Sequence, residues 1–599
     1  MIVAVCGTPL LAGALLLAAG RRAGRAAPAV AVGVAFLVLA AAVTAAVTRP
    51  AARFAFLPGR TGGLAVDDLS AVLAVTVASV LAAVLLYASV EGYGPRFHGL
   101  MLVFAGAMLV TVTASDLVLL LMGWEVMGAM SYALIGYIWQ DAGHVASADI
   151  AFLTTRAADT GLYAAAGFAL AGARSLELST LSGAADPWRD LIAGGVVLAA
   201  LGKSAQLPFS FWLARAMAGP SPVSALLHSA TMVAAGAYLL LRLHPLLAAT
   251  QWAETLVSWA GVLTALLLGA VALAQRDLKQ LLAASTCAQI GFMFLGAGTG
   301  SQAGGTSQLV AHAAVKSLLF LCAGAWLATL GTQRLDGLPG AARGHRLVGV
   351  TFGVGALALA GLPPLSLWIT KDTVLAAARE RSPALLAAGF AASVLSAAYA
   401  AKALAWAWRP AADGTPGGPG HRTPVPAGTA LTALAVAACV LGAVPWRRIL
   451  GVPDEARPHA WGLAVSGTVA AVTVAAVVAA VRRGGFTAPR WALGWLYLER
   501  AAVAGVARPV MALARALDRF DDRVIDGAVR SAARGAWWAS RLATGRIEVR
   551  VDGLTGAAGR GARRLGALAR RPQTGQVHLY YAQAAVVLGV LAAVALLAR

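Results

Sequence analysis

Two ionisable residues interrupt an apolar stretch of the sequence, residues 309–326, which reads LVAHAAVKSLLFLCAGAW. They are His312 and Lys316, and their spacing places them on one face of a helix. A charged side chain at the centre of a bilayer costs roughly 3 kcal/mol or more, so such a residue is rarely kept there without a function. Histidine and lysine can both take up and release protons. The pair therefore predicts a proton-relay site.

Lysine is rare in this chain, since only five of its 47 basic residues are lysines and the others are arginines. Arginine does not lose its proton in a protein, whereas a buried lysine can, because removal from water lowers its pKa. The lysines all lie in or beside apolar helical stretches: Lys203, Lys279, Lys316, Lys371 and Lys402. This placement indicates proton transfer. The alternative, preferred for Lys279 and left open for Lys402, is a side chain that reaches the membrane surface from a helix end.

A carboxylate inside an apolar helix could act together with a lysine. Glu125 lies in MGWEVMGAMSYALIGY without an adjacent charge, and Lys203 precedes Pro208, where the helix is expected to break. A carboxylate about 5 Å from an ammonium gains about 3 kcal/mol at an effective dielectric constant of about 20. Moving the carboxylate away would let the lysine release its proton. Glu125 and Lys203 are therefore candidates for an electrostatic switch.

Three further polar residues have a structural alternative. Arg156 and Asp159 are three positions apart on a predicted helix, as in an ion pair that only supports the fold. His228, in the following apolar stretch, could be a core histidine bonded to the backbone. Its companions favour a place in the proton path.

The elements that must position these residues are membrane helices. The chain has 599 residues, of which 59% are hydrophobic and 12% charged. A soluble protein has about 25% charged residues. Apolar runs of roughly 20 residues recur without alternation, which predicts an all-α polytopic membrane protein with about 16 transmembrane helices. The net charge of +21 lies mostly in short loops and in residues 482–576, as expected for cytoplasmic loops.

No cofactor site is visible in the sequence. The four cysteines lie apart in apolar runs, at Cys6, Cys287, Cys322 and Cys439, which gives no ligand set for zinc or an iron–sulfur cluster. No glycine-rich nucleotide-binding motif opens a helix. We therefore expect no cofactor in this chain, with any redox chemistry on a partner.

A short internal repeat suggests how the bundle is built. PFSFW at 208–212 and PLSLW at 364–368 each lie close to a lysine, and transporters often carry their polar site on broken helices in two repeated units. The sequence predicts two inverted five-helix repeats with broken helices. The expected divisions are N-terminal transmembrane helices at 1–95, a first repeat at 96–245, a second repeat at 246–408, additional transmembrane helices at 409–489, an amphipathic lateral helix with its connector at 490–576, and a C-terminal transmembrane helix at 577–599. Within the fifth, residues 491–541 alternate apolar and charged residues with helical periodicity, with a kink expected at Pro509.

Several of these segments resemble the antiporter-like membrane subunits of respiratory complex I. They also resemble subunits of multisubunit cation/proton antiporters and of membrane-bound hydrogenases. The resemblance runs over about residues 66–405, and its segments are GWEVMGAMSYALIGY, GKSAQLPFSFWLARAMAGPSPVSALLHSATMVAAGAYLLLR, RDLKQLLAASTCAQIGFMFL, HAAVKSLLFL and GLPPLSLWITKD. The long lateral helix and RRPQTGQVHLYY are similar to the distal pumping member of complex I.

The resemblance implies a proton path. It implies pairing of Glu125 with Lys203, a bridging His228, a central relay of His312 and Lys316, an exit pair of Lys371 and Asp372, and a supporting ion pair of Arg156 and Asp159. Two positions depart from the family pattern. Gln308 stands where some relatives have a second histidine, and Asp116, in place of an expected Asn, is interpreted as a helix start.

The implied function is proton translocation in an NADH–quinone oxidoreductase of the inner (plasma) membrane. NADH, flavin, iron–sulfur clusters and quinone would be held by partner subunits, and antiporter-like neighbours would lie along the lateral helix within the lipid bilayer. The alternatives are a subunit of a sodium/proton antiporter, the membrane subunit of a hydrogenase or of an inorganic-carbon uptake complex, and a passive scaffold that kept only the fold.

Overall fold

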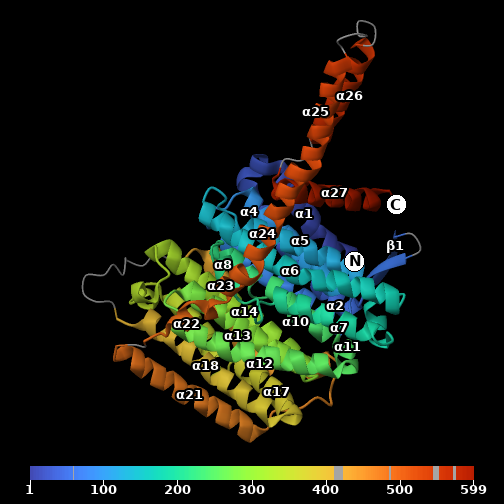
Figure 1. Ribbon diagram of the computed structural model, residues 1–599. Helices are drawn as coiled ribbons and strands as arrows, with labels where there is room; N and C mark the ends of the chain where they lie inside the picture. Colours follow the sequence, from blue (N-terminus) through green and yellow to red (C-terminus); the bar gives the residue numbers. More distant parts are fainter. Residues whose placement is uncertain (58–59, 411–422, 485–486, 544–551, 571–574, 599) are drawn as a thin grey trace. The chain divides into compact units, whose positions relative to one another are not determined.

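The computed structural model describes residues 1–57, 60–410, 423–484, 487–543, 552–570 and 575–598 (Figure 1). Its contacts divide the chain into two compact units, Met1–Leu498 and Glu499–Arg599. The predicted division at 489/490 lies close to this boundary, and the finer divisions stay predictions.

The first unit is a bundle of helices. In chain order its helices are α1 (Ile2–Ala19), α2 (Ala27–Thr48), α3 (Asp68–Ala88), α4 (Pro95–Thr113), α5 (Leu117–Ile135), α6 (Ala142–Gly172), α7 (Trp188–Lys203), α8 (Phe211–Ala216), α9 (Ser221–Leu227), α10 (Met232–Arg242), α11 (His244–Ala249), α12 (Gln251–Ala274), α13 (Leu278–Gly298), α14 (Gln302–Leu330), α15 (Ala341–Gly344), α16 (Arg346–Ala360), α17 (Ser366–Arg381), α18 (Pro383–Trp408), α19 (Val425–Val440), α20 (Trp446–Ile449), α21 (Ala460–Arg482) and α22 (Arg490–Leu493). The short helix α23 (Leu498–Ala502) begins at the last residue of this unit.

The predicted class, a helical protein with many membrane spans, is confirmed. Within the described residues, 12 helical stretches are long and apolar enough to cross a bilayer. One of them, Ile2–Thr48, joins α1 and α2 through a short 3₁₀ segment at Gly20–Ala26. The long helix α6 and the helices α7, α8, α16 and α17 lie outside these 12, so the expected number of about 16 stays a prediction.

One feature was not predicted, a β-hairpin between α2 and α3. Strands β1 (Ala51–Leu57) and β2 (Arg60–Ala65) pair antiparallel. The hairpin is fixed to α5 by Asp116, whose Oδ2 accepts from the backbone N–H of Gly63 at 2.9 Å. The other carboxylate oxygen of Asp116 accepts from two N–H groups in the first turn of α5. Asp116 is therefore a helix start, as expected, and it also holds the hairpin.

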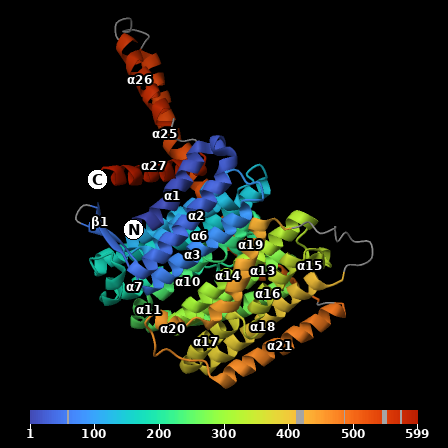
Figure 2. The ribbon, with the colours of Figure 1, turned by 180° about the vertical axis from the view of Figure 1, so that it is seen from behind.

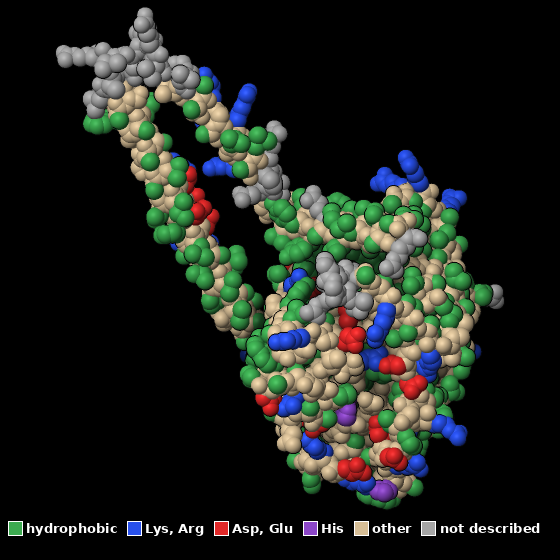
Figure 3. Space-filling view, turned by 90° about the vertical axis from the view of Figure 1, so that its right-hand side faces the viewer, with side chains coloured by type: hydrophobic (Ala, Val, Ile, Leu, Met, Phe, Trp, Pro, Cys, Tyr) green, Lys and Arg blue, Asp and Glu red, His purple; other side chains and the backbone are tan. Residues whose placement is uncertain are grey.

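Ion pairs link helix ends at the end of the bundle that carries β1 and α11. Asp67 caps α3 through a reciprocal pair of bonds with Ser70 and also pairs with Arg242 at the end of α10. Burial raises the pKa of the Asp67 carboxyl, but Arg242 and Ser70 outweigh this and hold it at about 2. Figure 3 shows charged side chains scattered among hydrophobic ones on this end. Charges at helix ends and apolar flanks are typical of a membrane bundle.

Two helices are broken where the sequence predicted it. PFSFW leads from the end of α7 into α8, and PLSLW leads from the end of α16 into α17. Lys203 is the last residue of the first half-helix, α7, whereas Lys371 lies in the second half-helix, α17. The two lysines therefore do not occupy equivalent positions in their broken helices.

Side chains satisfy the backbone groups that the first break exposes. The Trp212 indole N–H donates to the carbonyl of Gly202 at 2.9 Å. The Gln206 amide donates to the carbonyls of Ser204 and Cys287, at 3.0 and 3.2 Å. A break within a membrane needs such partners, because lipid offers no hydrogen bonds. The bond to Cys287 also ties this break to α13.

A third interruption was not expected. α9 ends at Leu227 and α10 begins at Met232, so His228 lies in a non-helical link rather than within a continuous span. Helices α13 and α14 lie in the interior, where α14 packs against α9, α13, α16, α17 and α19 (Figure 2). Every residue of α13 except Gln280 is buried.

The second unit contains the predicted amphipathic helix. It holds α24 (Arg508–Phe520), α25 (Asp526–Ala543), α26 (Asp552–Arg570) and the apolar α27 (Val577–Leu597). π-helical turns at Val503–Ala507 and Asp521–Ile525 connect the first segments, and Pro509 follows the first of these turns. The apolar side chains of α24, among them Val510, Leu513 and Leu517, are exposed. Their contact with the membrane surface or with neighbours stays a prediction.

Candidate proton-transfer site

All five lysines of the chain are buried. Their exposed fractions are 0% for Lys203 and Lys316, 3% for Lys371, 4% for Lys279 and 8% for Lys402. Three of them, Lys203, Lys316 and Lys371, each lie in a different polar cluster. We name these the first, second and third lysine clusters.

The first cluster forms where α5, α6 and α7 meet. The ammonium of Lys203 lies 3.1 Å from Oδ2 of Asp159, and both side chains are buried. The Trp124 indole donates to Oδ1 of the same carboxylate at 2.7 Å, and Lys203 lies 4.9 Å from the centre of the Trp124 ring. Asp159 is therefore held by one charged and one neutral donor, and Lys203 also gains a cation–π contact.

The direct contacts in this cluster differ from the expected pairings, although Glu125 still lies within electrostatic range of Lys203. Glu125 pairs with Arg156, and Asp159 pairs with Lys203. The Arg156 and Glu125 side chains keep 32% and 24% of their surface exposed, whereas Asp159 points inward. Although Arg156 and Asp159 are close in sequence, they reach different partners because Asp159 faces α5 and α7. Whether Glu125 lies on the proton path stays a prediction.

The second cluster surrounds Lys316 on α14. Its ammonium donates to the carbonyl of Leu282 at 3.0 Å and to the hydroxyl of Ser285, both on α13. Among the described residues no carboxylate pairs with Lys316. A lysine whose partners are all neutral loses no ion pair when it gives up a proton, which suits a relay group.

Two buried histidines accompany Lys316. His312 lies one turn before it on α14, and its ring faces the backbone of Ser229 without a hydrogen bond of normal geometry. Neither ring nitrogen of His228 has a hydrogen-bond partner among the described residues. The His228 ring contacts that of Phe320 on α14, 5.5 Å away between centres. The alternative interpretation of His228, a core histidine bonded to the backbone, is therefore not supported by the hydrogen bonds of the described residues.

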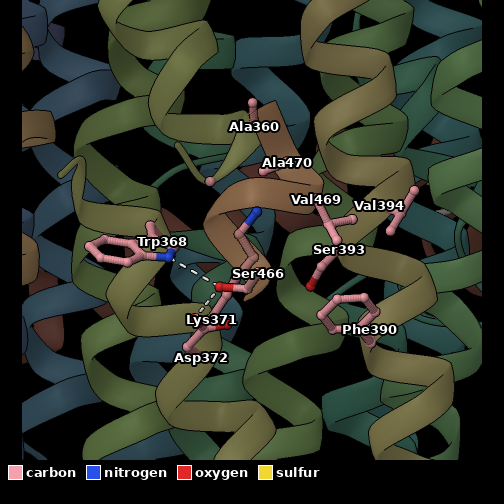
Figure 4. A pocket seen from close by; sticks show the side chains of 11 residues that line it. Ala360, Trp368, Lys371, Asp372, Phe390, Ser393, Val394, Ser466, Val469 and Ala470 are labelled. Carbon is pink, nitrogen blue, oxygen red and sulfur yellow. Dashed lines mark hydrogen bonds between the residues drawn. The ribbon is translucent and has the colours of Figure 1, made fainter. Parts of the chain in front are cut away.

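The third cluster lies where α17, α18 and α21 meet (Figure 4). Lys371 donates to the carbonyl of Leu359 and to the hydroxyl of Ser396, each at 3.1 Å. Its neighbour Asp372 instead accepts from the Ser466 hydroxyl on α21, and Figure 4 shows the Lys371 nitrogen turned away from Asp372. The two residues therefore have separate partners.

A small cavity lies between Lys371 and Asp372. Its volume of about 20 Å³ is enough for one water molecule, and Trp368 and Ser393 also line it. The indole of Trp368 donates to Ser466 at 3.1 Å. The cavity would let a water connect the ammonium with the carboxylate.

Helix α13 links the second and third clusters. It supplies Leu282 and Ser285 to Lys316, its Gln289 donates to Ser396 beside Lys371, and its Cys287 carbonyl accepts from Gln206 at the first break. Ser285 and Gln289 were not among the residues predicted to act. A serine and a glutamine four positions apart in an apolar run, at 285 and 289, were the available signal.

The two remaining lysines bind backbone carbonyls. Lys279 donates to the carbonyl of Gly219 at 2.8 Å, so the preferred interpretation that it reaches the membrane surface was wrong. Lys402 donates to the carbonyls of Leu273 and Gln275 at 2.7 Å, at the end of α12. A cation at the C-terminus of a helix is a stabilising cap. Both lysines therefore have structural partners.

Comparison with known proteins finds relatives for the part of the chain that carries the three lysines. Residues 114–396, which contain all three lysines, match the sequence profile described as "NADH:quinone oxidoreductase/Mrp antiporter, TM". The chain is 34% identical over 434 residues to NAD(P)H-quinone oxidoreductase chain 5 of Picosynechococcus sp., and the alignment covers 64% of this chain and 65% of that relative.

A second curated relative is NADH-quinone oxidoreductase subunit L of Escherichia coli. It is 39% identical over 356 residues, which cover 56% of this chain and 57% of the relative. The chain thus spans less than two thirds of the length of either relative.

Two solved structures share the fold. The Mrp complex from Dietzia sp. matches with a TM-score of 0.71 and 27% identity, over 95% of this chain and 62% of that chain. Respiratory complex I from Thermus thermophilus matches with a TM-score of 0.67 and 25% identity, over 79% of this chain and 100% of that chain.

Proposed function

We propose that the chain is a proton-translocating membrane subunit of an NADH–quinone oxidoreductase. The observation that carries the proposal is the set of three buried lysines, each in a different polar cluster, of which α13 contacts the second and the third. Burying three ammonium groups in a membrane bundle costs free energy. A chain that served only as a scaffold would be more stable without them, so their presence favours a role in transport. The names of the curated relatives support the same class of complex.

The clusters suggest a division of work. In the first cluster, withdrawal of Asp159 from Lys203 would weaken the hold on the ammonium, which is the switch expected from the sequence with a different carboxylate. In the second, Lys316 and His312 would hold the proton in transit, with His228 beside them. In the third, Lys371 and Asp372 would release it through the cavity between them.

The remaining parts of the proposal concern the assembly. NADH, flavin, iron–sulfur clusters and quinone would reside on partner subunits, and quinone reduction there would drive the proton through this chain. The lateral helix would contact antiporter-like neighbours, and the complex would lie in the bacterial plasma membrane. Its curated bacterial relatives support this placement.

A second candidate is a subunit of a multisubunit sodium/proton antiporter. It is favoured by the likeness to the Mrp complex, which extends over 95% of this chain. The two candidates differ in what copurifies and in the ion that is moved.

The test is affinity purification of the tagged chain from its own membranes, followed by identification of its partners and by transport assays in vesicles. We expect flavin- and iron–sulfur-containing subunits, and acidification driven by NADH and quinone without a sodium requirement. Partners without redox centres, together with sodium-dependent proton exchange, would favour the antiporter instead.

A further inference from the structure

Gln308, on the helix that carries His312 and Lys316, belongs to a buried chain of hydrogen bonds. Its Nε2 donates to Oε1 of Gln289 on α13 at 2.9 Å, and its Oε1 accepts from the Thr370 hydroxyl at 2.7 Å. None of these three side chains is more than 1% exposed. Gln308 thus joins α14 to both α13 and α17, away from solvent.

The amide of Gln289 continues this chain to Lys371. Its Nε2 donates to the hydroxyls of Ser396 at 2.9 Å and of Tyr399 at 2.8 Å. The ammonium of Lys371 donates to the same Ser396 oxygen at 3.1 Å. Gln289 and Lys371 therefore share an acceptor atom. Hydrogen bonds between side chains thus connect α14, which carries His312 and Lys316, with the third lysine cluster.

More donors are directed at Ser396 than its oxygen can accept. Its own hydrogen goes to the carbonyl of Leu359 at 2.7 Å, which leaves two lone pairs. Three donors face them, from Lys371, Gln289 and the Tyr399 hydroxyl at 3.2 Å. While Lys371 is an ammonium ion, one of the three N–H or O–H groups directed at Ser396 finds no free lone pair on its oxygen. After Lys371 has released a proton, its nitrogen can accept from Ser396, and each donor in the group can be satisfied.

The two glutamines cannot themselves relay a proton. A glutamine amide has a carbonyl acceptor and two N–H donors but no titratable group, unlike an imidazole. The bonds run in one direction, from Thr370 through Gln308 and Gln289 to Ser396. Reversing these hydrogen bonds requires both side-chain amides to rotate by half a turn. The rotation of Gln308 would change the hydrogen bonds that α14 makes with α13 and α17.

We propose that Gln289 and Gln308 form an amide bridge that transmits the charge state of Lys371 to α14 by rearranging hydrogen bonds, and that the bridge passes no proton itself. This inference rests on the proposed function, because it assigns the bridge to proton translocation. Gln289 and Gln308 are positioning residues: they act through Lys371 and through the helix that carries Lys316.

The first test compares two substitutions of Gln308 in the purified complex in vesicles. Gln308→Leu removes both hydrogen bonds at similar volume, whereas Gln308→His keeps an acceptor for Thr370 and a donor for Gln289. We expect Gln308→Leu to slow pumping about tenfold, as for a lost hydrogen bond beside a charge, and Gln308→His to retain most of the wild-type rate. An unchanged rate in Gln308→Leu, or an equal loss in both variants, would overturn the proposal.

A second test separates transmission from mere support of the fold. The double variant Gln289→Leu, Gln308→Leu leaves fewer polar groups unpaired than Gln308→Leu alone, so we expect its Tm to lie closer to that of the wild type than the Tm of Gln308→Leu does. Its pumping is expected to stay as low as in Gln308→Leu. Recovery of pumping together with Tm would show that the glutamines only hold the helices, and would overturn the bridge. A wild-type complex that pumps no protons would instead overturn the proposed function.

Discussion

The ammonium of Lys203 lies 3.1 Å from the carboxylate of Asp159, and the Trp124 indole lies 2.7 Å from the other oxygen of that carboxylate. Both charged groups are buried, whereas the neighbouring pair of Glu125 and Arg156 is partly exposed. The acid in direct contact with the first lysine is therefore Asp159. Substitutions at the two acids should have unequal effects.

Asp159→Asn is expected to impair the protein far more than Glu125→Gln. Removing one partner of a buried ion pair costs about 3–5 kcal/mol, because the other charge is left buried alone, whereas a partly exposed pair contributes about 1 kcal/mol or less. The measurements are the Tm of the purified protein and its pumping rate in vesicles, with Glu125→Gln as the matched control. Equal losses in the two variants would contradict the pairing.

Trp124→Phe keeps the aromatic ring but removes the donor to Asp159. A hydrogen bond to a charged group contributes about 1.5–3 kcal/mol, so we expect Trp124→Phe to lower the Tm and the pumping rate. Both losses should be smaller than those in Asp159→Asn. Because Phe keeps most of the cation–π contact with Lys203, the loss reports on the hydrogen bond. A variant as stable as the wild type would show that the indole N–H is dispensable.

Gly361→Ala is expected to displace the ammonium of Lys371. A Cβ at this position would lie 3.0 Å from Nζ, and Gly361 has a φ of 79°, which costs other residues about 1–2 kcal/mol. Gly353→Ala, within helix α16, which ends just before Gly361, is the control, since its Cβ would meet nothing closer than 3.8 Å. We expect slower pumping and a lower Tm for Gly361→Ala only. Similar behaviour of both variants would argue against a tight fit around Lys371.

Asp67→Asn tests the ion pair at the end of the bundle through pH. The pKa of Asp67 is held at about 2, below its ordinary value of 3.8. A depressed carboxyl pKa stabilises the folded state above the unfolded-state pKa, and this contribution is lost as the pH falls through the folded-state pKa. The Tm difference between wild type and Asp67→Asn should therefore be present at pH 7 and shrink between about pH 4 and pH 2. A difference independent of pH would mean that Asp67 acts only as a neutral cap.

The class of fold and the burial of the lysines could be predicted from the sequence. Long apolar runs indicate membrane helices, and the retention of lysine in a chain that otherwise uses arginine marks Lys203, Lys316 and Lys371. The two proline-containing repeats located the broken helices. The hairpin at 51–65 and the non-helical link at His228 could not be predicted in this way. Neither is marked by a long polar stretch that would interrupt the apolar runs.

The partners of the lysines could not be predicted in the same way. Residues of α5, α6 and α7 meet only in the folded bundle, so the proximity of Arg156 and Asp159 in the sequence did not reveal their direct partners, Glu125 and Lys203. Ser285, Gln289 and Ser396 are small or neutral residues in apolar helices, and such residues are more often bonded to their own backbone. Their place beside Lys316 and Lys371 follows from tertiary packing.

Lys316→Arg, assayed for proton pumping in vesicles, tests most directly whether buried lysines carry the proton. Arginine keeps the positive charge and can donate to Leu282 and Ser285, but it does not give up its proton. We expect the complex to assemble and to lose pumping through this chain. Pumping at the wild-type rate by Lys316→Arg would contradict the proposal that Lys316 releases a proton during transport.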